Sequence, residues 1–137
     1  METFALKIVT PDGSAFDGVA KKLFCRTING DVGILPRHSD YCTALGMGSA
    51  HVVFEDDKVR YAACIGGMLS VLGGKVNLVA TTWEWAEDID KNRAAASQAR
   101  AEKVLAHTSA ENEQDRREYE LAQARLKRAL VRQSIAK

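Results

Sequence analysis

Charged residues at helical spacing are the part of this sequence that could do chemistry. The stretch AEDIDKNRAAASQAR, residues 86–100, places Asp90 and Arg93 about one turn apart and Arg100 two turns beyond Arg93. Such charges either pair with one another on a solvated helix surface or bind an anionic ligand. The rest of the sequence is needed to choose between these interpretations.

A second group of arginines lies near the C-terminus. Arg125, Arg128 and Arg132 follow an i, i+3, i+7 pattern, which stacks three cations along one face of a helix. Guanidinium groups bind phosphate oxygens in bidentate fashion, so the pattern is typical of an oligophosphate site. If the two helices pair in antiparallel fashion, Arg93 and Arg100 face Arg128 and Arg132 across the seam.

The alternative interpretation assigns these charges to ordinary helix chemistry. Bases near the end of a helix and acids near its start complement the helix dipole, and the predicted second helix segregates its charges in this way. Asp90 and Arg93 are spaced as an i, i+3 surface ion pair, which contributes little to stability. On these grounds the arginines are plain surface charge.

Motifs for catalysis and metal binding are missing from the sequence. Gly74-Lys75 resembles the end of a phosphate-binding loop, but Leu69 occupies the required glycine position and Val76 replaces the serine or threonine. Neither a G-x-S-x-G nor an H-E-x-x-H motif occurs, and the three cysteines form no C-x-x-C pair. Nothing in the sequence favours an enzyme or a metal site.

Composition limits the partners and the compartment. The net charge is +1, with ten acids and eight bases in residues 1–87 and eight acids and eleven bases in residues 88–137. This imbalance is too small for nucleic-acid binding, but it favours a phosphate or an acidic protein surface. There is no apolar run that could span a bilayer and no signal-peptide pattern, so we expect a cytosolic location.

The first 85 residues read as a series of short strands. TFALKIVT alternates Phe4, Leu6 and Ile8 with more polar residues, and KKLFCRTI, AHVVFE, VRYAACI, MLSVLG and KVNLVAT follow. Turn residues separate these segments, and the pair Gly73-Gly74 predicts a two-residue hairpin. The pattern predicts a β-sandwich or flattened barrel over residues 1–85.

Residues 86–137 predict an antiparallel two-helix hairpin, because glycine and proline are absent after residue 74 and alanine is frequent. Asp88 is the expected N-cap of a first helix that ends near His107. Thr108 and Glu111 have the spacing of a capping box for a second helix that reaches Ser134. Few large apolar residues are available between the helices, so we expect a marginal hairpin that opens easily.

Three segments carry the motifs of a known family. Residues 30–48, GDVGILPRHSDYCTALGMG, are similar to the G-E-x-G-I-x-P-G-H-x-P-x-x-T-x-L-x-x-G segment of the ε subunit of bacterial F-type ATP synthases. Residues 89–94, IDKNRA, match its [IL]-D-x-x-R-A motif, and LKRALVR resembles its C-terminal helix. The likeness extends over essentially the whole chain in the same order.

The resemblance implies a non-catalytic rotor subunit of the central stalk, which couples proton or sodium flow to ATP synthesis. In that family the sandwich, here residues 1–85, binds the γ subunit and the ring of c subunits. The hairpin, here residues 86–137, folds down or extends into the catalytic α/β hexamer, where it inhibits ATP hydrolysis. The implied location is the cytoplasmic face of the inner membrane, where the subunit is peripheral and membrane-associated only through the complex.

The resemblance also implies the site residues. No cofactor is required, but ATP is implied as a regulatory ligand of the folded hairpin. The positions that match the family's ATP site are Glu84, Ile89, Asp90, Arg93, Ala94, Arg100, Arg128 and Arg132. Asp31 and His38 match polar positions of the c-ring contact, whereas Arg37 stands where the family has glycine, and Ser39-Asp40-Tyr41 also departs from the pattern.

Two other functions are compatible with the residues. A free-standing ATP-sensing module would bind the nucleotide without belonging to a rotary complex. A passive structural adaptor would have a permanently closed hairpin, with arginines that bind no nucleotide.

Overall fold

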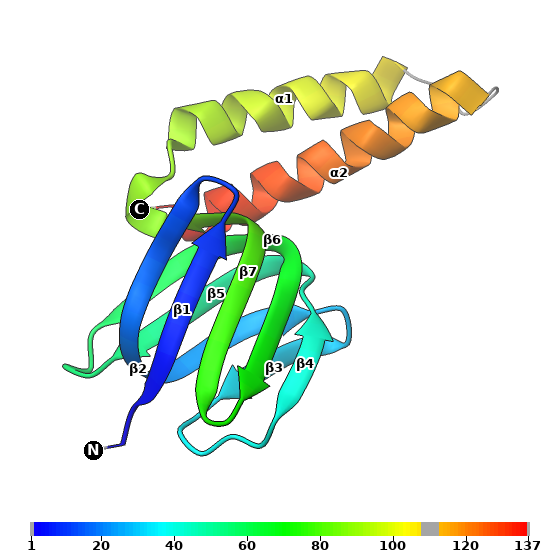
Figure 1. Ribbon diagram of the computed structural model, residues 1–137. Helices are drawn as coiled ribbons and strands as arrows, with labels where there is room; N and C mark the ends of the chain where they lie inside the picture. The colour runs from blue at the N-terminus through cyan, green and yellow to red at the C-terminus, as the bar shows by residue number, and fades with distance from the viewer. Residues whose placement is uncertain (1, 108–112, 137) are drawn as a thin grey trace. The chain divides into compact units, whose positions relative to one another are not determined.

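The computed structural model describes residues 2–107 and 113–136 (Figure 1). The chain divides into two compact units, residues 1–86 and 87–137. The first contains all the described strands, coloured blue to green in Figure 1, and the second contains the two long helices. Each unit is described by itself below.

Seven strands form the described part of the first unit, residues 2–86. They are β1 Phe4–Thr10, β2 Gly13–Thr27, β3 Gly30–Ile34, β4 Tyr41–Ala44, β5 Met47–Phe54, β6 Val59–Leu72 and β7 Lys75–Trp85. Their order is β1-β7-β6-β5-β2-β3, β4 pairs with β6, and a further pairing of β1 with β2 closes the sheet on itself. All pairings are antiparallel except that of β1 with β7. This confirms the predicted β-sandwich.

The core lies inside the closed sheet. Phe4, Leu6 and Ile8 are buried, as their alternation in the sequence predicts, because side chains two residues apart on a strand point to the same face. Leu23 of β2 and Leu78 of β7 are fully buried in the same apolar cluster. Burial of these side chains is the main contribution to the stability of the first unit.

Strand β6 bends at a pair of glycines. Its first half, up to Ile65, pairs with β5, and its second half, from Met68 onward, pairs with β4. Gly66 and Gly67 between them have φ angles of 68° and 117°. The segments VRYAACI and MLSVLG, expected as separate strands, therefore form one strand that turns from one side of the sandwich to the other while β7 stays paired along it.

The second unit contains helices α1 Lys91–His107 and α2 Glu113–Ile135. A 3-10 turn, Ala86–Asp88, precedes α1. Asp88 is therefore not the N-cap; Asp90 is, because its Oδ1 accepts a hydrogen bond of 3.0 Å from the backbone N–H of Arg93. The predicted capping box of Thr108 and Glu111 lies outside the described residues.

Alanines form the buried faces of the two helices. Ala94 and Ala101 of α1 and Ala122 and Ala129 of α2 are buried, each pair seven residues apart and so on one helix face. Gln133 Nε2 donates a hydrogen bond of 2.6 Å to Gln98 Oε1, which joins the end of α2 to the first half of α1.

Several large apolar residues of the hairpin stay partly exposed. Val104, Leu121 and Leu130 are 39–46% exposed. The fully buried side chains of the described parts of α1 and α2 are therefore alanines, which bury little apolar area. This packing supports the expectation of a marginal hairpin.

Candidate nucleotide-binding groove and ring-contact segment

Asp90 and Arg93 are held by the start of α1. The Asp90 side chain caps the helix through the Arg93 backbone N–H, and the Asp90 carbonyl accepts a 3.0 Å hydrogen bond from the backbone N–H of Ala94. Within residues 2–107 and 113–136, no ion pair joins the Asp90 carboxylate to the Arg93 guanidinium. The simple surface pair considered above is therefore not formed, and the Arg93 side chain is exposed.

A groove of about 410 Å³ lies between the two helices. Its walls are Ser97, Arg100, Ala101 and Val104 of α1, and Ala122, Arg125, Arg128 and Arg132 of α2. Four of these eight side chains are arginines and none is a carboxylate. Arg100 Nη2 donates a hydrogen bond of 3.1 Å to Ser97 Oγ, which orients that guanidinium on the surface of α1.

The charge of the groove suits an anion. Arg128 and Arg132 are four residues apart and Arg125 and Arg128 are three apart, so their like charges destabilise α2 by a few tenths of a kcal/mol per pair. A phosphate chain would relieve this repulsion and accept hydrogen bonds from the guanidinium groups. The groove extends about 10 Å along α1, from Ser97 to Val104 at 1.5 Å per residue.

The structure brings together Arg100, Arg128 and Arg132, three of the residues matched to the family's ATP site. The other matched residues do not line the groove: Glu84, Ile89, Asp90, Arg93 and Ala94. Ile89 and Ala94 are buried, and Glu84 is half-buried on β7 of the first unit. Arg125 also lines the groove but is not among the residues matched to the family's site. Its i, i+3, i+7 spacing with Arg128 and Arg132 is the sequence signal that could have identified it.

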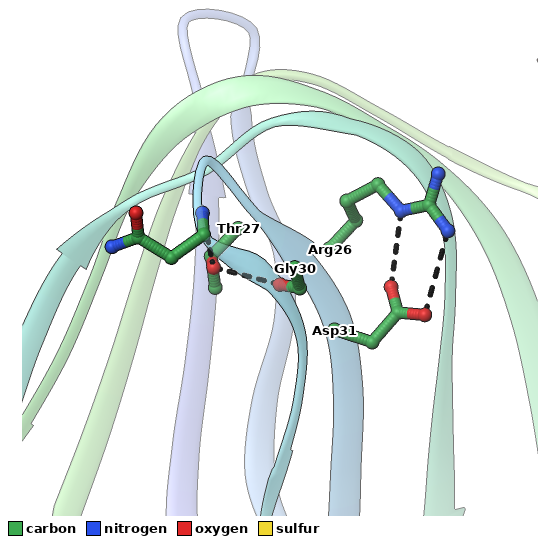
Figure 2. A network of polar contacts seen from close by, with 5 residues as sticks. Arg26, Thr27, Gly30 and Asp31 are labelled. Carbon is green, nitrogen blue, oxygen red and sulfur yellow. Dashed lines mark hydrogen bonds and ion pairs between the residues drawn. The ribbon is translucent and has the colours of Figure 1, made fainter.

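Asp31 of the expected c-ring contact is engaged within its own sheet. Its Oδ1 accepts a hydrogen bond of 3.0 Å from Arg26 Nε, and its Oδ2 accepts one of 3.4 Å from Arg26 Nη2 (Figure 2). The two residues are direct cross-strand partners of β2 and β3. The hydrogen bonds from Arg26, and then its positive charge, lower the pKa of the Asp31 carboxyl. Asp31 therefore stays ionised at a lower pH than an isolated aspartate does.

The turn beside Asp31 is fixed by a threonine. Thr27 Oγ1 donates a 2.7 Å hydrogen bond to the Gly30 carbonyl and accepts a 3.1 Å hydrogen bond from the backbone N–H of Asn29 (Figure 2). Gly30 has a φ of 111°, which glycine adopts without strain. These contacts hold the start of β3, and thus Asp31, in a defined place.

His38 lies in the segment between β3 and β4. Its Nδ1 is 2.7 Å from the Ser39 carbonyl oxygen, and its ring centroid is 5.9 Å from that of Tyr41. Asp40 Oδ1 accepts a 3.0 Å hydrogen bond from the backbone N–H of Gly73. The departure Ser39-Asp40-Tyr41 therefore ties this segment to the β6–β7 hairpin, which has positive φ at Gly73 and Gly74 as the sequence predicts.

Arg37, which stands where the family pattern has glycine, adopts a backbone conformation that favours glycine. Its φ is 64°, in the left-handed region, and its Nη2 is 2.6 Å from Glu2 Oε1 in an exposed ion pair. A left-handed residue with a Cβ costs about 1–2 kcal/mol. Arg37 therefore places an exposed charge in this segment at a position of backbone strain.

Arg37→Gly is accordingly expected to stabilise the chain by about 0.5–1 kcal/mol. The relief of left-handed strain exceeds the extra chain entropy that glycine has in the unfolded state, and the exposed Glu2 pair contributes little. Urea unfolding followed by circular dichroism measures the change. Ser39→Gly, in the same segment, is the control, and an equal loss of stability in both variants would contradict the strain at Arg37.

Two of the three cysteines are buried. Burial raises the pKa of the Cys25 and Cys64 thiols to about 12, so both stay protonated and unreactive. Within the described residues, no group of three or more histidine, cysteine, aspartate or glutamate side chains could hold a metal ion. None of the helices in residues 2–107 and 113–136 has the length and apolar content needed to cross a membrane.

Family comparisons cover both units. A model described as the beta-sandwich domain of the ATP synthase Delta/Epsilon chain matches residues 3–86, and one described as its long alpha-helix domain matches residues 87–137. Proteins named ATP synthase epsilon chain are similar over nearly the full length. That of Exiguobacterium sp. is 36% identical over 98% of this chain and 96% of its own. That of Ruminococcus albus is 36% identical over 99% of this chain and 98% of its own.

A solved structure shares the fold. A chain in the mitochondrial ATP synthase of Euglena gracilis aligns with a TM-score of 0.76 at 22% identity, covering 93% of this chain and 79% of that chain. Because the two family models span residues 3–137 and the two named relatives match almost end to end, the chain belongs to the ATP synthase delta/epsilon chain family.

Proposed function

We propose that this chain is a non-catalytic epsilon subunit of the ATP synthase central stalk whose helical hairpin inhibits ATP hydrolysis when extended and binds ATP when folded. Family membership supports the subunit assignment. The observation that carries the regulatory part is the groove between α1 and α2, which is lined by four arginines and lacks carboxylates.

The groove links ligand binding to hairpin closure. Its arginines come from both helices, so the complete site exists only while α1 and α2 are paired. A ligand that binds one of two states shifts the population toward that state by its differential affinity. At a free concentration 100 times its dissociation constant, a ligand increases the stability of the closed hairpin by about 2.7 kcal/mol. This is a large effect on helices that pack mainly through alanines.

The two ends of the ligand require different chemistry. Phosphates suit the arginines of the groove, whereas a carboxylate such as that of Asp90 repels phosphate and can accept a hydrogen bond from an amino group of a base. We therefore assign the nucleoside to the end of the hairpin that holds Ile89, Asp90 and Arg93. Ile89 is 7% exposed, so its role requires the backbone or a local adjustment.

The sandwich supplies the contacts to the rotor. We assign the γ subunit and the c-subunit ring as its partners, with Asp31 and His38 on the ring-facing side. The extended basic helix α2 would then meet an acidic surface of the catalytic α/β hexamer. The subunit would be peripheral, on the cytoplasmic face of the inner membrane, and would bind neither nucleic acid nor lipid directly.

Titration of the purified chain with ATP tests the regulatory part. A guanidinium–phosphate hydrogen bond contributes about 1.5–3 kcal/mol, so Arg128→Ala is expected to weaken ATP binding about 10- to 100-fold by calorimetry. Arg93→Ala is expected to weaken it as well. Arg116→Ala removes an exposed arginine of α2 outside the groove and should leave the affinity unchanged.

The outcomes separate this proposal from its rivals. Unchanged affinity in both Arg93→Ala and Arg128→Ala would rule out the arginine groove as the ATP site. Absence of ATP binding to the unsubstituted chain would favour a passive structural adaptor. ATP binding without capture of a γ subunit in a pull-down would favour a free-standing sensor.

A further inference from the structure

The four arginines of the groove form a ladder with a defined order. Gln98 of α1 bonds Gln133 of α2, and the helices are antiparallel (Figure 1). Arg132 therefore lies beside the Ser97 end of the groove. Arg125 lies about 10 Å further along α2, at 1.5 Å per residue, toward the Val104 end.

The ladder extends away from the end assigned to the nucleoside. Ile89, Asp90 and Arg93 are at or before the start of α1, and the groove begins one turn later at Ser97. A phosphate chain that enters the groove at its Ser97 end meets Arg132 and Arg100 first and Arg128 next. Arg125 is the last cation that it reaches.

No contact within the described residues explains why an arginine occupies position 125. Its side chain is exposed, and within residues 2–107 and 113–136 it has neither an ion pair nor a hydrogen bond through its guanidinium. It stands three residues from Arg128, where a like charge is mildly unfavourable. It nevertheless lines the same groove as the other three arginines.

We propose that Arg125 is a specificity-determining residue that binds the terminal phosphate of a triphosphate chain and sets the preference of the groove for triphosphate over diphosphate. This inference rests on the proposed ATP site but concerns a residue outside the set matched to the family. A diphosphate ends about one phosphate earlier, beside Arg128, and leaves Arg125 without a partner. Removal of Arg125 therefore affects only the longer chain.

The test uses the full chain and four probes: ATP, ADP, inorganic triphosphate and pyrophosphate. Arg125→Ala is expected to weaken ATP and inorganic triphosphate about tenfold or more, because one charge-assisted contact is lost, and to change ADP and pyrophosphate less than about twofold. Arg128→Ala should weaken all four probes. Lys127→Ala removes an exposed cation of α2 next to this stripe but outside the groove, and should change none of them.

The outcomes distinguish the two claims, which are the ATP site and the role of Arg125. Equal losses of affinity for triphosphates and diphosphates in Arg125→Ala would show that Arg125 attracts anions only by its charge, and would overturn the inference. No change for any probe would overturn it as well. Binding of inorganic triphosphate but not ATP to the unsubstituted chain would reject the ATP site, and the triphosphate and pyrophosphate pair would still decide the role of Arg125. Binding of neither would reject both claims.

Discussion

Gly67→Ala is expected to lower the free energy of unfolding of the sandwich by about 3 kcal/mol or more, enough to leave a marginal domain largely unfolded. Two costs combine at this position. The φ of 117° is a conformation that only glycine adopts without strain. A Cβ at Gly67 would also overlap the Val79 carbonyl oxygen and lie 2.8 Å from the Ala80 Cα, so it meets the backbone of β7 itself.

The backbone contact makes this position unforgiving. A side chain in the way could rotate, but β7 cannot move without loosening its pairing with β6 and β1. Leu78, next to the contact, is fully buried in the core. The steric overlap at Gly67 would therefore displace β7 and disturb the packing of the core.

Gly13→Ala provides a matched control. Gly13 has a φ of 122°, nearly the same as Gly67, but a Cβ there would have no heavy atom within 4 Å. The same substitution at Gly13 thus measures the conformational strain alone, expected to be about 1–2 kcal/mol. Urea unfolding of both variants, followed by far-UV circular dichroism, gives the difference, and equal losses would show that the contact with β7 is unimportant.

The bend at Gly66-Gly67 also shows what the sequence could and could not predict about the fold. The alternation of Phe4, Leu6 and Ile8 was sufficient to predict a buried face, because the side-chain period of a strand is a local property. The sequence predicted VRYAACI and MLSVLG as two separate strands, which is wrong, because β6 runs through Gly66 and Gly67. Sequence alone could not show that one strand continues through this pair, because that depends on pairing with β7, a long-range contact.

The site could be predicted only where it depends on local spacing and not on contacts between distant parts of the chain. The arginines of α2 were predicted to share a face because their spacing is helical, and the structure places them in one groove. The ion pair of Arg26 with Asp31 was not predicted, because it depends on the register between β2 and β3. The cap at Asp90 rather than Asp88 differs because residues 86–88 form a 3-10 turn, and both aspartates satisfy the local cap preference.

Ala129→Glu is expected to open the hairpin while the sandwich stays folded. Ala129 is 0% exposed on the face of α2 that also buries Ala122, so an added side chain has no room and the carboxylate would lose its water. Overpacking costs about 1–3 kcal/mol and an unpaired buried charge costs several more, so we expect a loss of about 3 kcal/mol or more. The helices are a separate compact unit, so β-sheet unfolding should be unchanged.

Hydrogen exchange measures this opening segment by segment. Amides of α1 and α2 should exchange about 100-fold faster or more in Ala129→Glu, since 1.4 kcal/mol corresponds to a factor of ten, while amides of the buried strands keep their protection. Gln123→Glu introduces the same carboxylate at an exposed position of α2 and should leave exchange nearly unchanged. Equal protection of the helices in both variants would show that the alanine face does not hold them together.

The same variant connects packing with regulation. A loss of about 3 kcal/mol is close to the roughly 2.7 kcal/mol that ATP binding at the proposed site would supply at 100 times its dissociation constant, so ATP at that concentration should restore most of the helix protection. In the assembled ATP synthase, the opened hairpin should inhibit ATP hydrolysis more strongly and respond less to ATP. The buried alanines and the arginine groove then act on the same equilibrium between the closed and the open hairpin. Because the packing of the helices is weak, the ligand decides which state is populated.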